Sequence, residues 1–154
     1  MWHTREQSGL TLDRELKWWH DGARIEHPNI IEAFNCGLVI GDDGRYQLHF
    51  GGDWCFVTVE DCGYAVVAVD EAADHRLSIR LSDRTAEWLD PLSLAAGDDG
   101  VLTVKVKDGK AKARFTREAH FELGARLKAE GEQVVIDVQG TRWPTSLEPA
   151  VLAR

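Results

Sequence analysis

The residues that could ligate a metal or act as nucleophiles are six histidines and three cysteines, which are scattered along the chain. No two cysteines show the C-x-x-C spacing, and no two histidines the H-x-x-x-H spacing, that structural zinc sites use. Cys62 follows Glu60 and Asp61, and neighbouring carboxylates raise the pKa of a thiol, which disfavours the reactive thiolate. We therefore expect no metal site and no cysteine nucleophile.

The carboxylates that could form an acid–base pair lie at the two ends of one expected strand, with Asp53 before it and Glu60 at its end. Seven residues at about 3.3 Å each separate the two by about 23 Å, which is too far for acid–base partnership. The sequence also contains no phosphate-binding loop and no dinucleotide fingerprint. We assign no catalytic residue and no cofactor, although folding could bring His20, His49 and Asp53 together as a convergent acid–base site.

Two consecutive tryptophans, Trp18 and Trp19, point to opposite faces of a sheet if they lie in a strand. One of the two rings must then leave the core face, and its N–H group needs a partner. Beside arginines, such a ring could line a pocket for a planar or anionic ligand at the seam between two lobes; otherwise it only packs that seam. The candidate ligand-binding residues are Trp18, Trp19, Arg24, Arg45, His49, Arg80 and Arg84.

The elements that would position these residues centre on residues 42–70, where the sequence predicts three consecutive antiparallel strands. Arg45–Phe50 alternates polar and apolar residues with the period of a half-buried strand. Trp54–Glu60 is rich in aromatic and β-branched residues, and Tyr64–Val69 is apolar almost throughout. Glycine-containing breaks separate these runs, which is typical of a meander.

The remaining chain is expected to extend this meander into two lobes. We predict an N-terminal arm over residues 1–17, a first lobe over 18–72, a second β-rich lobe over 73–147 and a loose tail over 148–154. In the first lobe, a hairpin turns at Asp21-Gly22, and a helix begins at Pro28, whose missing N–H does no harm in the first turn. Ile30, Ile31 and Phe34 recur at helical spacing, so this helix should pack on the sheet.

The second lobe is built from further turn signals. The turn Asp108-Gly109 joins two alternating runs in the clearest hairpin of the chain. Residues 82–89 are expected to form a short helix capped by Ser82 or Asp83. The spacing in residues 120–128 permits either strand or helix, and a last strand is expected over 134–138.

Several of these motifs, taken in order, resemble the bacterial domain of unknown function 1285 family over roughly residues 18–147. The matching pieces are the Asp21-Gly22 hairpin with the helix after it, Asp43-Gly44-Arg45-Tyr46-x-Leu48, Val59-Glu60-Asp61-x-x-Tyr64, Leu77-x-Ile79, Pro91-Leu92, Val104-x-Val106-Lys107-Asp108-Gly109, Phe121-Glu122-Leu123 and the closing strand near Val135. The resemblance implies an α+β, mostly β fold of two small antiparallel lobes of β-roll or split-barrel character, the first with one packed helix. It implies no activity.

Charge and composition exclude several classes of partner. The 26 acidic and 18 basic residues give a net charge of −8, which works against binding the phosphate backbone of nucleic acids. No apolar run approaches the roughly 20 residues of a membrane span, and the polar N-terminus does not read as a signal peptide. An odd number of cysteines fits a reducing compartment, so we expect a cytoplasmic protein.

Together these observations favour a non-enzymatic cytoplasmic module that binds a small molecule or a protein partner at the seam between two β lobes. One alternative is an enzyme whose acid–base residues converge only in three dimensions. Another is a structural homodimer built through an exposed strand edge, for which the lysine-rich segment Lys105–Lys112 is the candidate.

Overall fold

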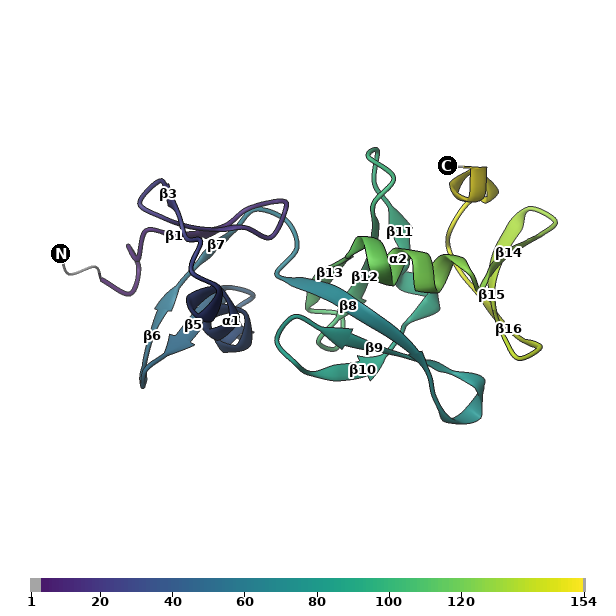
Figure 1. The fold of residues 1–154 in the computed structure, drawn as a ribbon, viewed down its shortest axis with the longest axis horizontal. Helices are drawn as coiled ribbons and strands as arrows, with labels where there is room; N and C mark the ends of the chain where they lie inside the picture. Colours follow the sequence, from purple (N-terminus) through teal and green to yellow (C-terminus); the bar gives the residue numbers. More distant parts are fainter. Residues whose placement is uncertain (1–3, 154) are drawn as a thin grey trace. The chain divides into compact units, whose positions relative to one another are not determined.

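The structure is a computed structural model that describes residues 4–153, in which the chain forms two compact units. The first unit contains the residues up to Tyr64 together with the loop Ser82–Arg84, and the second contains Ala65–Leu81 and the residues from Thr85 onward. Both units are built mostly from short strands with one α-helix each, and the sheets are open (Figure 1). The expected α+β, mostly β class with two lobes is confirmed.

Two small sheets and one helix make up the first unit. The strands are β1 (Leu10–Leu12), β2 (Trp18–His20), β3 (Ala23–Arg24), β4 (Leu38–Ile40), β5 (Tyr46–Phe50), β6 (Asp53–Phe56) and β7 (Thr58–Val59). One sheet has the order β3-β2-β1-β7, in which β1 and β7 run parallel, and the other has the order β4-β5-β6. The Asp21-Gly22 turn joins β2 to β3 as the sequence predicted, with both residues at positive φ.

The helix of the first unit, α1 (Pro28–Gly37), begins at residues that favour the start of a helix. The backbone N–H of Asn29 donates to the imidazole Nδ1 of His27, and Pro28 occupies the first turn. The helix packs on β5, but none of its residues is fully buried, and Ile30 is 38% exposed. The packed helix is therefore confirmed, whereas its apolar stripe is only partly covered.

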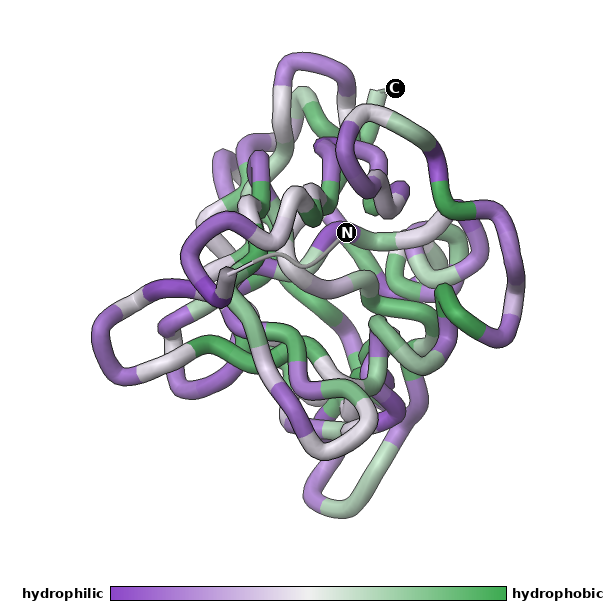
Figure 2. Tube along the Cα trace, turned by 90° about the vertical axis from the view of Figure 1, so that its left-hand side faces the viewer, coloured by the Kyte–Doolittle hydropathy of each residue, from purple (hydrophilic) through white to green (hydrophobic). Residues whose placement is uncertain are grey.

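A six-stranded sheet forms the centre of the second unit, with the order β10-β9-β8-β13-β12-β11. Its strands are β8 (Tyr64–Glu71), β9 (Leu77–Leu81), β10 (Ala86–Trp88), β11 (Ala95–Ala96), β12 (Leu102–Val106) and β13 (Ala111–Phe115). Alternate residues of β9, β12 and β13 are buried, as period-2 strands with one covered face require. Figure 2 colours the trace by hydropathy, and several of the protruding loops are purple, that is, hydrophilic.

The rest of the second unit is a helix followed by a three-stranded sheet. Helix α2 (Arg117–Gly124) is capped by the Thr116 side chain, which accepts from the backbone N–H of Ala119. The sheet β14-β15-β16 consists of β14 (Leu127–Glu130), β15 (Gln133–Val138) and β16 (Thr141–Pro144). Residues 120–128, which the sequence left open, are thus helical to Gly124 and extended from Leu127. Short 3₁₀ helices lie at Ala73–His75, Pro91–Ser93 and Pro149–Ala153.

The predicted meander is wrong, because its three strands do not pair in sequence order. Strand β5 pairs with β6, but the chain then leaves that sheet, and Thr58–Val59 pairs with β1. Strand β8 belongs to the six-stranded sheet of the second unit, where it lies between β9 and β13. The boundary therefore lies after Tyr64 and not after residue 72. An apolar run predicts a doubly covered strand but does not identify its neighbours.

Four smaller expectations also need correction. The arm over residues 1–17 contains β1, which lies inside the first sheet, and its residues 1–3 fall outside the described chain. Residues 82–89 contain strand β10 rather than a helix, since Ala86–Trp88 pairs with β9. The segment Lys105–Lys112 is no sheet edge, because β12 and β13 have neighbours on both sides. In the tail, Pro149–Ala153 is a 3₁₀ helix, and residue 154 is not described.

Candidate functional site

A pocket of about 420 Å³ in the first unit is lined by both apolar and polar side chains, and we call it the apolar pocket. Its apolar side chains are Leu10 on β1, Ile25 after β3, Ile30 and Phe34 on α1, and Trp54 on β6. Its polar residues are Thr4, Arg5, Ser8, His20 and Asp53, and Cys55 completes the lining. The volume lies within the range of about 300–1,000 Å³ that small-molecule sites occupy.

Aromatic contacts hold the wall of the apolar pocket in place. Phe34 meets Trp18 edge to face with ring centroids 5.3 Å apart, and it meets Phe50 in the same geometry at 5.3 Å. On the β6 side, Trp54 packs edge to face on Phe56 at 5.2 Å and stacks with His49 at 6.2 Å. Such pairs fix ring orientations, so the wall is preformed rather than assembled around a ligand.

The charged residues that line the apolar pocket lie close to groups of opposite charge. The Arg5 guanidinium lies 4.4 Å from the centre of the Trp54 ring, and its Nη2 is 3.3 Å from the Asp53 carboxylate. The backbone N–H of Trp54 and the Arg5 guanidinium both donate to Asp53, and these hydrogen bonds hold its pKa below the usual range. The imidazole of His20 lies 3.6 Å from Asp21.

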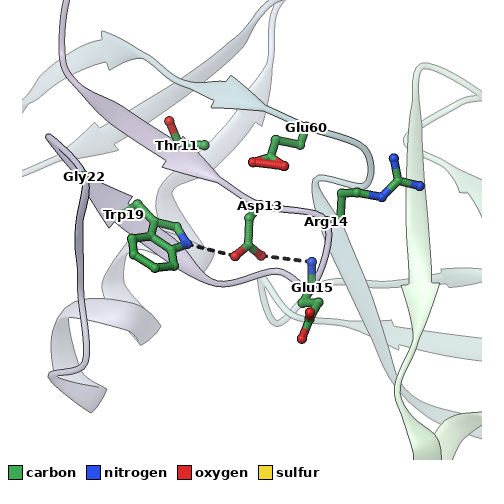
Figure 3. Close-up of a pocket in the computed structure, with 7 residues that line it drawn as sticks. All are labelled: Thr11, Asp13, Arg14, Glu15, Trp19, Gly22 and Glu60. Carbon is green, nitrogen blue, oxygen red and sulfur yellow. Dashed lines mark hydrogen bonds between the residues drawn. The ribbon is translucent and has the colours of Figure 1, made fainter.

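A second hollow of about 520 Å³ in the first unit surrounds Trp19 and is mainly acidic (Figure 3). The Trp19 Nε1–H donates to the Asp13 Oδ2 over 2.8 Å, while Asp13 Oδ1 accepts the backbone N–H groups of Glu15 and Lys17, each over 2.9 Å. Burial alone would raise the pKa of Asp13, but these hydrogen bonds together lower it. Both oxygens of this carboxylate hold the turn between β1 and β2, so Asp13 is not poised for proton transfer.

The candidate residues taken from the sequence occupy several different environments. Trp18 is buried and donates to Asn35 Oδ1 over 2.8 Å. Trp19 lines the acidic hollow, and His49 stacks on the wall of the apolar pocket. Arg45 lies 3.4 Å from the centre of the Phe56 ring and pairs with Glu6.

The other three candidate residues are exposed arginines. Arg24 is on strand β3 of the first unit, and Arg84 in the loop Ser82–Arg84 pairs with Glu32 on α1. Arg80 is on β9 of the second unit, where its Nε is 3.3 Å from Asp70. None of the seven candidates lines the apolar pocket.

The positions of His20, His49 and Asp53 give little support to a shared acid–base site. His20 and Asp53 both line the apolar pocket, but Asp53 is 81% exposed and paired with Arg5. His49 is exposed and hydrogen-bonds the Gln47 side chain over 3.1 Å. Burial raises the pKa of Cys55, which disfavours its thiolate. Within residues 4–153, no three His, Cys, Asp or Glu side chains are grouped to hold a metal ion.

No family model matches the chain, and no curated protein matches it. Among solved structures, it is similar to a DUF1285 family protein from Silicibacter pomeroyi DSS-3, with 18% identity, coverage of 95% of this chain and 83% of that one, and a TM-score of 0.68. It is also similar to a DUF1285 family protein from Shewanella baltica OS155, with 20% identity, coverage of 75% and 89%, and a TM-score of 0.54. The chain has the DUF1285 fold. The resemblance seen in the sequence is confirmed at the level of fold.

Sequence reasoning missed the residues that form the apolar pocket within this DUF1285 fold. The stripe of Ile30 and Phe34 was assigned wholly to packing, because helical spacing does not show how much of the stripe a small sheet covers. Arg5 lies in a polar segment with no strand pattern, so no signal placed it over Trp54. The usable signal was the cluster of aromatic residues near Phe50 and Trp54 in the sequence.

None of the helices in residues 4–153 is both long and apolar enough to cross a membrane.

Proposed function

We propose that the first unit binds a small, largely apolar molecule with a neutral hydrogen-bonding end group in the apolar pocket. The observation that carries this proposal is the wall formed by Ile30, Phe34 and Trp54, which remains partly open to solvent although its rings are held by aromatic contacts. Covering such a surface gains about 25 cal/mol for each Å² removed from water. The proposal places the ligand within the first unit, rather than at the seam that the sequence favoured.

The balance of charge in the pocket lining supports a neutral end group. Arg5 is paired with Asp53, and the imidazole of His20 lies beside Asp21, so both groups already have an anionic neighbour. A ligand carboxylate would compete with Asp53 for Arg5 and would lie near that carboxylate. A ligand ammonium would face the guanidinium. An amide or hydroxyl can donate to Asp53 and accept from Arg5 without disturbing their ion pair.

A small molecule fits the geometry better than a protein segment. The pocket is concave, and its lining combines apolar side chains with a few polar groups, which is the composition of a small-molecule site. The protein-partner alternative depends on exposed apolar residues outside the pocket, of which Phe50 at 52% and Val39 at 40% exposure are examples. Exposed apolar residues at single positions are common on protein surfaces.

The test compares four ligands that share an eight-carbon body: octanamide, 1-octanol, octanoate and octylamine. Binding is measured by isothermal titration calorimetry and by the shift of the melting temperature, because a ligand that binds only the native state raises that temperature. We expect octanamide and 1-octanol to bind at least about fivefold more tightly than octanoate and octylamine.

Two variants locate the site and provide its control. Ile30→Ser removes an apolar side chain from the pocket wall and should weaken octanamide binding about tenfold. Val39→Ser replaces a side chain with similar exposure in the same unit but outside the lining, and it should leave the affinity unchanged. Equal effects of the two variants, or no binding by any of the four ligands, would contradict the proposal.

We also propose a reducing cytoplasmic location, as the sequence favoured. In support, Cys36, Cys55 and Cys62 form no disulfide bond within residues 4–153. Trapping the thiols in intact cells with a maleimide reagent tests this proposal. All three should be modified after denaturation, and recovery of an oxidised form would contradict it.

A further inference from the structure

A second hollow surface, in the second unit, presents cations and an aromatic ring together. It has a volume of about 450 Å³ and lies along one face of α2 and the neighbouring turn, and we call it the α2 face. Its lining includes Arg114, Arg117, His120 and Phe121. The apolar pocket lies wholly in the first unit, so the two surfaces share no residue.

Helix geometry places three of these residues on one side of α2. Arg117 and Phe121 are four residues apart, and His120 is three residues after Arg117, so all three side chains leave the same face. Phe121 is 80% exposed, the highest exposure among the large apolar residues in the described chain. The ring of Phe121 is therefore accessible to a ligand bound on the α2 face.

Two side chains of the α2 face, those of Arg117 and His120, are available for a ligand. Within residues 4–153, the guanidinium of Arg117 and the imidazole of His120 make no hydrogen bond and no ion pair with another side chain. Other arginines of the second unit, such as Arg80 and Arg126, are instead paired with carboxylates. Arg117 therefore differs from these paired arginines.

Two acidic groups lie near the α2 face. Asp99 also lines the surface, but its Oδ1 accepts the backbone N–H of Val101 over 3.0 Å. Glu118 is in the first turn of α2, and it points about 100° away from Arg117 around the helix. The start of α2 also contributes partial positive charge from its first backbone N–H groups.

We propose that the α2 face binds a small aromatic phosphate, whose ring stacks on Phe121 while its phosphate is bound by Arg117 and His120, with Arg114 beside them. A guanidinium donates two parallel hydrogen bonds to phosphate oxygens, which gives the contact both strength and direction. Stacking on Phe121 covers the exposed ring and explains why an aromatic residue stands beside the cations. A nucleoside monophosphate is a ligand of this class.

The experiment uses the full chain and four probes: phenyl phosphate, adenosine monophosphate, phenol and inorganic phosphate. Affinities come from calorimetry, and the binding surface is located from amide chemical-shift changes in the ¹⁵N-labelled protein. Phenyl phosphate and adenosine monophosphate should each bind at least about tenfold more tightly than phenol or inorganic phosphate. The largest shifts should fall in residues 99–101 and 114–121.

Three variants separate the contributions of charge and ring. Arg117→Gln should weaken phenyl phosphate binding about tenfold and leave phenol binding unchanged. Phe121→Ala should weaken phenyl phosphate at least about fivefold and leave inorganic phosphate unchanged. Leu92→Ala is the matched control, because Leu92 is 62% exposed in the same unit and lies outside the α2 face. The amide spectrum of each variant verifies that it is folded.

Any of three results would overturn the proposal. Phenol binding as tightly as phenyl phosphate would show that the anion plays no part. Inorganic phosphate binding as tightly as phenyl phosphate would show that the surface holds an adventitious ion only. Shifts centred on the first unit, or affinities within twofold of the unchanged protein for both Arg117→Gln and Phe121→Ala, would place the binding elsewhere.

Discussion

Asp13 uses both oxygens of its carboxylate to hold the turn that leads from β1 into β2. Its partners are the Trp19 indole N–H and the backbone N–H groups of Glu15 and Lys17. All of them are donors, so the turn requires the ionised form of the carboxyl. The lowered pKa of Asp13 follows from these donors, which outweigh the opposing effect of burial.

This arrangement predicts a pH-dependent contribution to stability. Because the folded pKa lies below the unfolded value of about 3.9, the contribution is fully present above about pH 5 and is lost as pH falls through the folded pKa. At pH 7, Asp13→Asn should lower the free energy of unfolding by about 1–2 kcal/mol, because an amide cannot replace two charged acceptor oxygens. Urea unfolding from pH 7 to pH 2.5, followed by tryptophan fluorescence, should show that the difference between wild type and variant shrinks below about pH 4.

Glu15→Gln is the control for this measurement. The exposed Glu15 carboxylate makes no hydrogen bond or ion pair within the described residues, so the substitution should change little at any pH. A difference for Asp13→Asn that stays constant down to pH 2.5 would show that the shape of the side chain matters and its charge does not.

Single residues were only partly predictable from the sequence. The opposite orientation of Trp18 and Trp19 followed from strand geometry, and the structure buries one ring and leaves the other half-exposed. Their partners, Asn35 and Asp13, could not be inferred, because a side-chain hydrogen bond depends on the path of another segment. His120 and Phe121 of the α2 face were not placed together, because residues 120–128 could not be assigned to helix or strand.

At the scale of elements, strand β1 is the feature whose importance the sequence understated. Three residues, Leu10–Leu12, pair antiparallel with β2 on one side and parallel with β7 on the other. The side chain of Leu12 is only 1% exposed, and the backbone N–H of Glu60 donates to its carbonyl over 3.0 Å. The segment expected to be a polar arm therefore contributes a buried side chain to the core of the first unit and backbone hydrogen bonds to its sheet.

This position predicts a large cost for truncating Leu12. Leu12→Ala should lower the free energy of unfolding of the first unit by about 2–5 kcal/mol, the usual cost of removing a buried leucine side chain. Thermal and urea unfolding measure the effect, and hydrogen exchange assigns it to amides of β1, β2 and β7. Val39→Ala, at an exposed position of the same unit, should cost less than about 1 kcal/mol. If Leu12→Ala lowered the free energy of unfolding by less than about 1 kcal/mol, β1 would contribute little to the stability of the unit.

Elements with local signals were predicted well, and those fixed by distant pairing were not. The Asp21-Gly22 and Asp108-Gly109 turns and the helix that starts at Pro28 all depend on residues within a few positions. The parallel pairing of β1 with β7 joins residues more than 45 positions apart, and no short-range pattern encodes it. The same holds for β8, whose sequence showed that it is buried but not which sheet receives it.

At the scale of the whole molecule, the acidic residues are unevenly divided between the two units. In the first unit, 12 acidic residues oppose 6 basic ones, whereas in the second unit 14 oppose 12, so that formal charges of −6 and −2 make up the net −8. The near balance of the second unit leaves room for a local cationic surface such as the α2 face. A short anion can reach such a surface, but a long polyanion must also approach the acidic remainder of the chain.

We therefore expect the protein to bind short anions more tightly than long polyanions. At pH 7.5 and 150 mM salt, binding to a 20-base-pair DNA duplex should be weaker than about 100 µM, because few phosphates could be neutralised while a net charge of −8 opposes approach. Fluorescence anisotropy of a labelled duplex measures this directly. Below the isoelectric point of about 5.2 the net charge becomes positive, and binding that weakens steeply with added salt should emerge. Micromolar binding at pH 7.5 with a steep salt dependence would contradict the prediction. If Arg117→Glu abolished that binding, the α2 face would be a site for nucleic acid and not for a small aromatic phosphate.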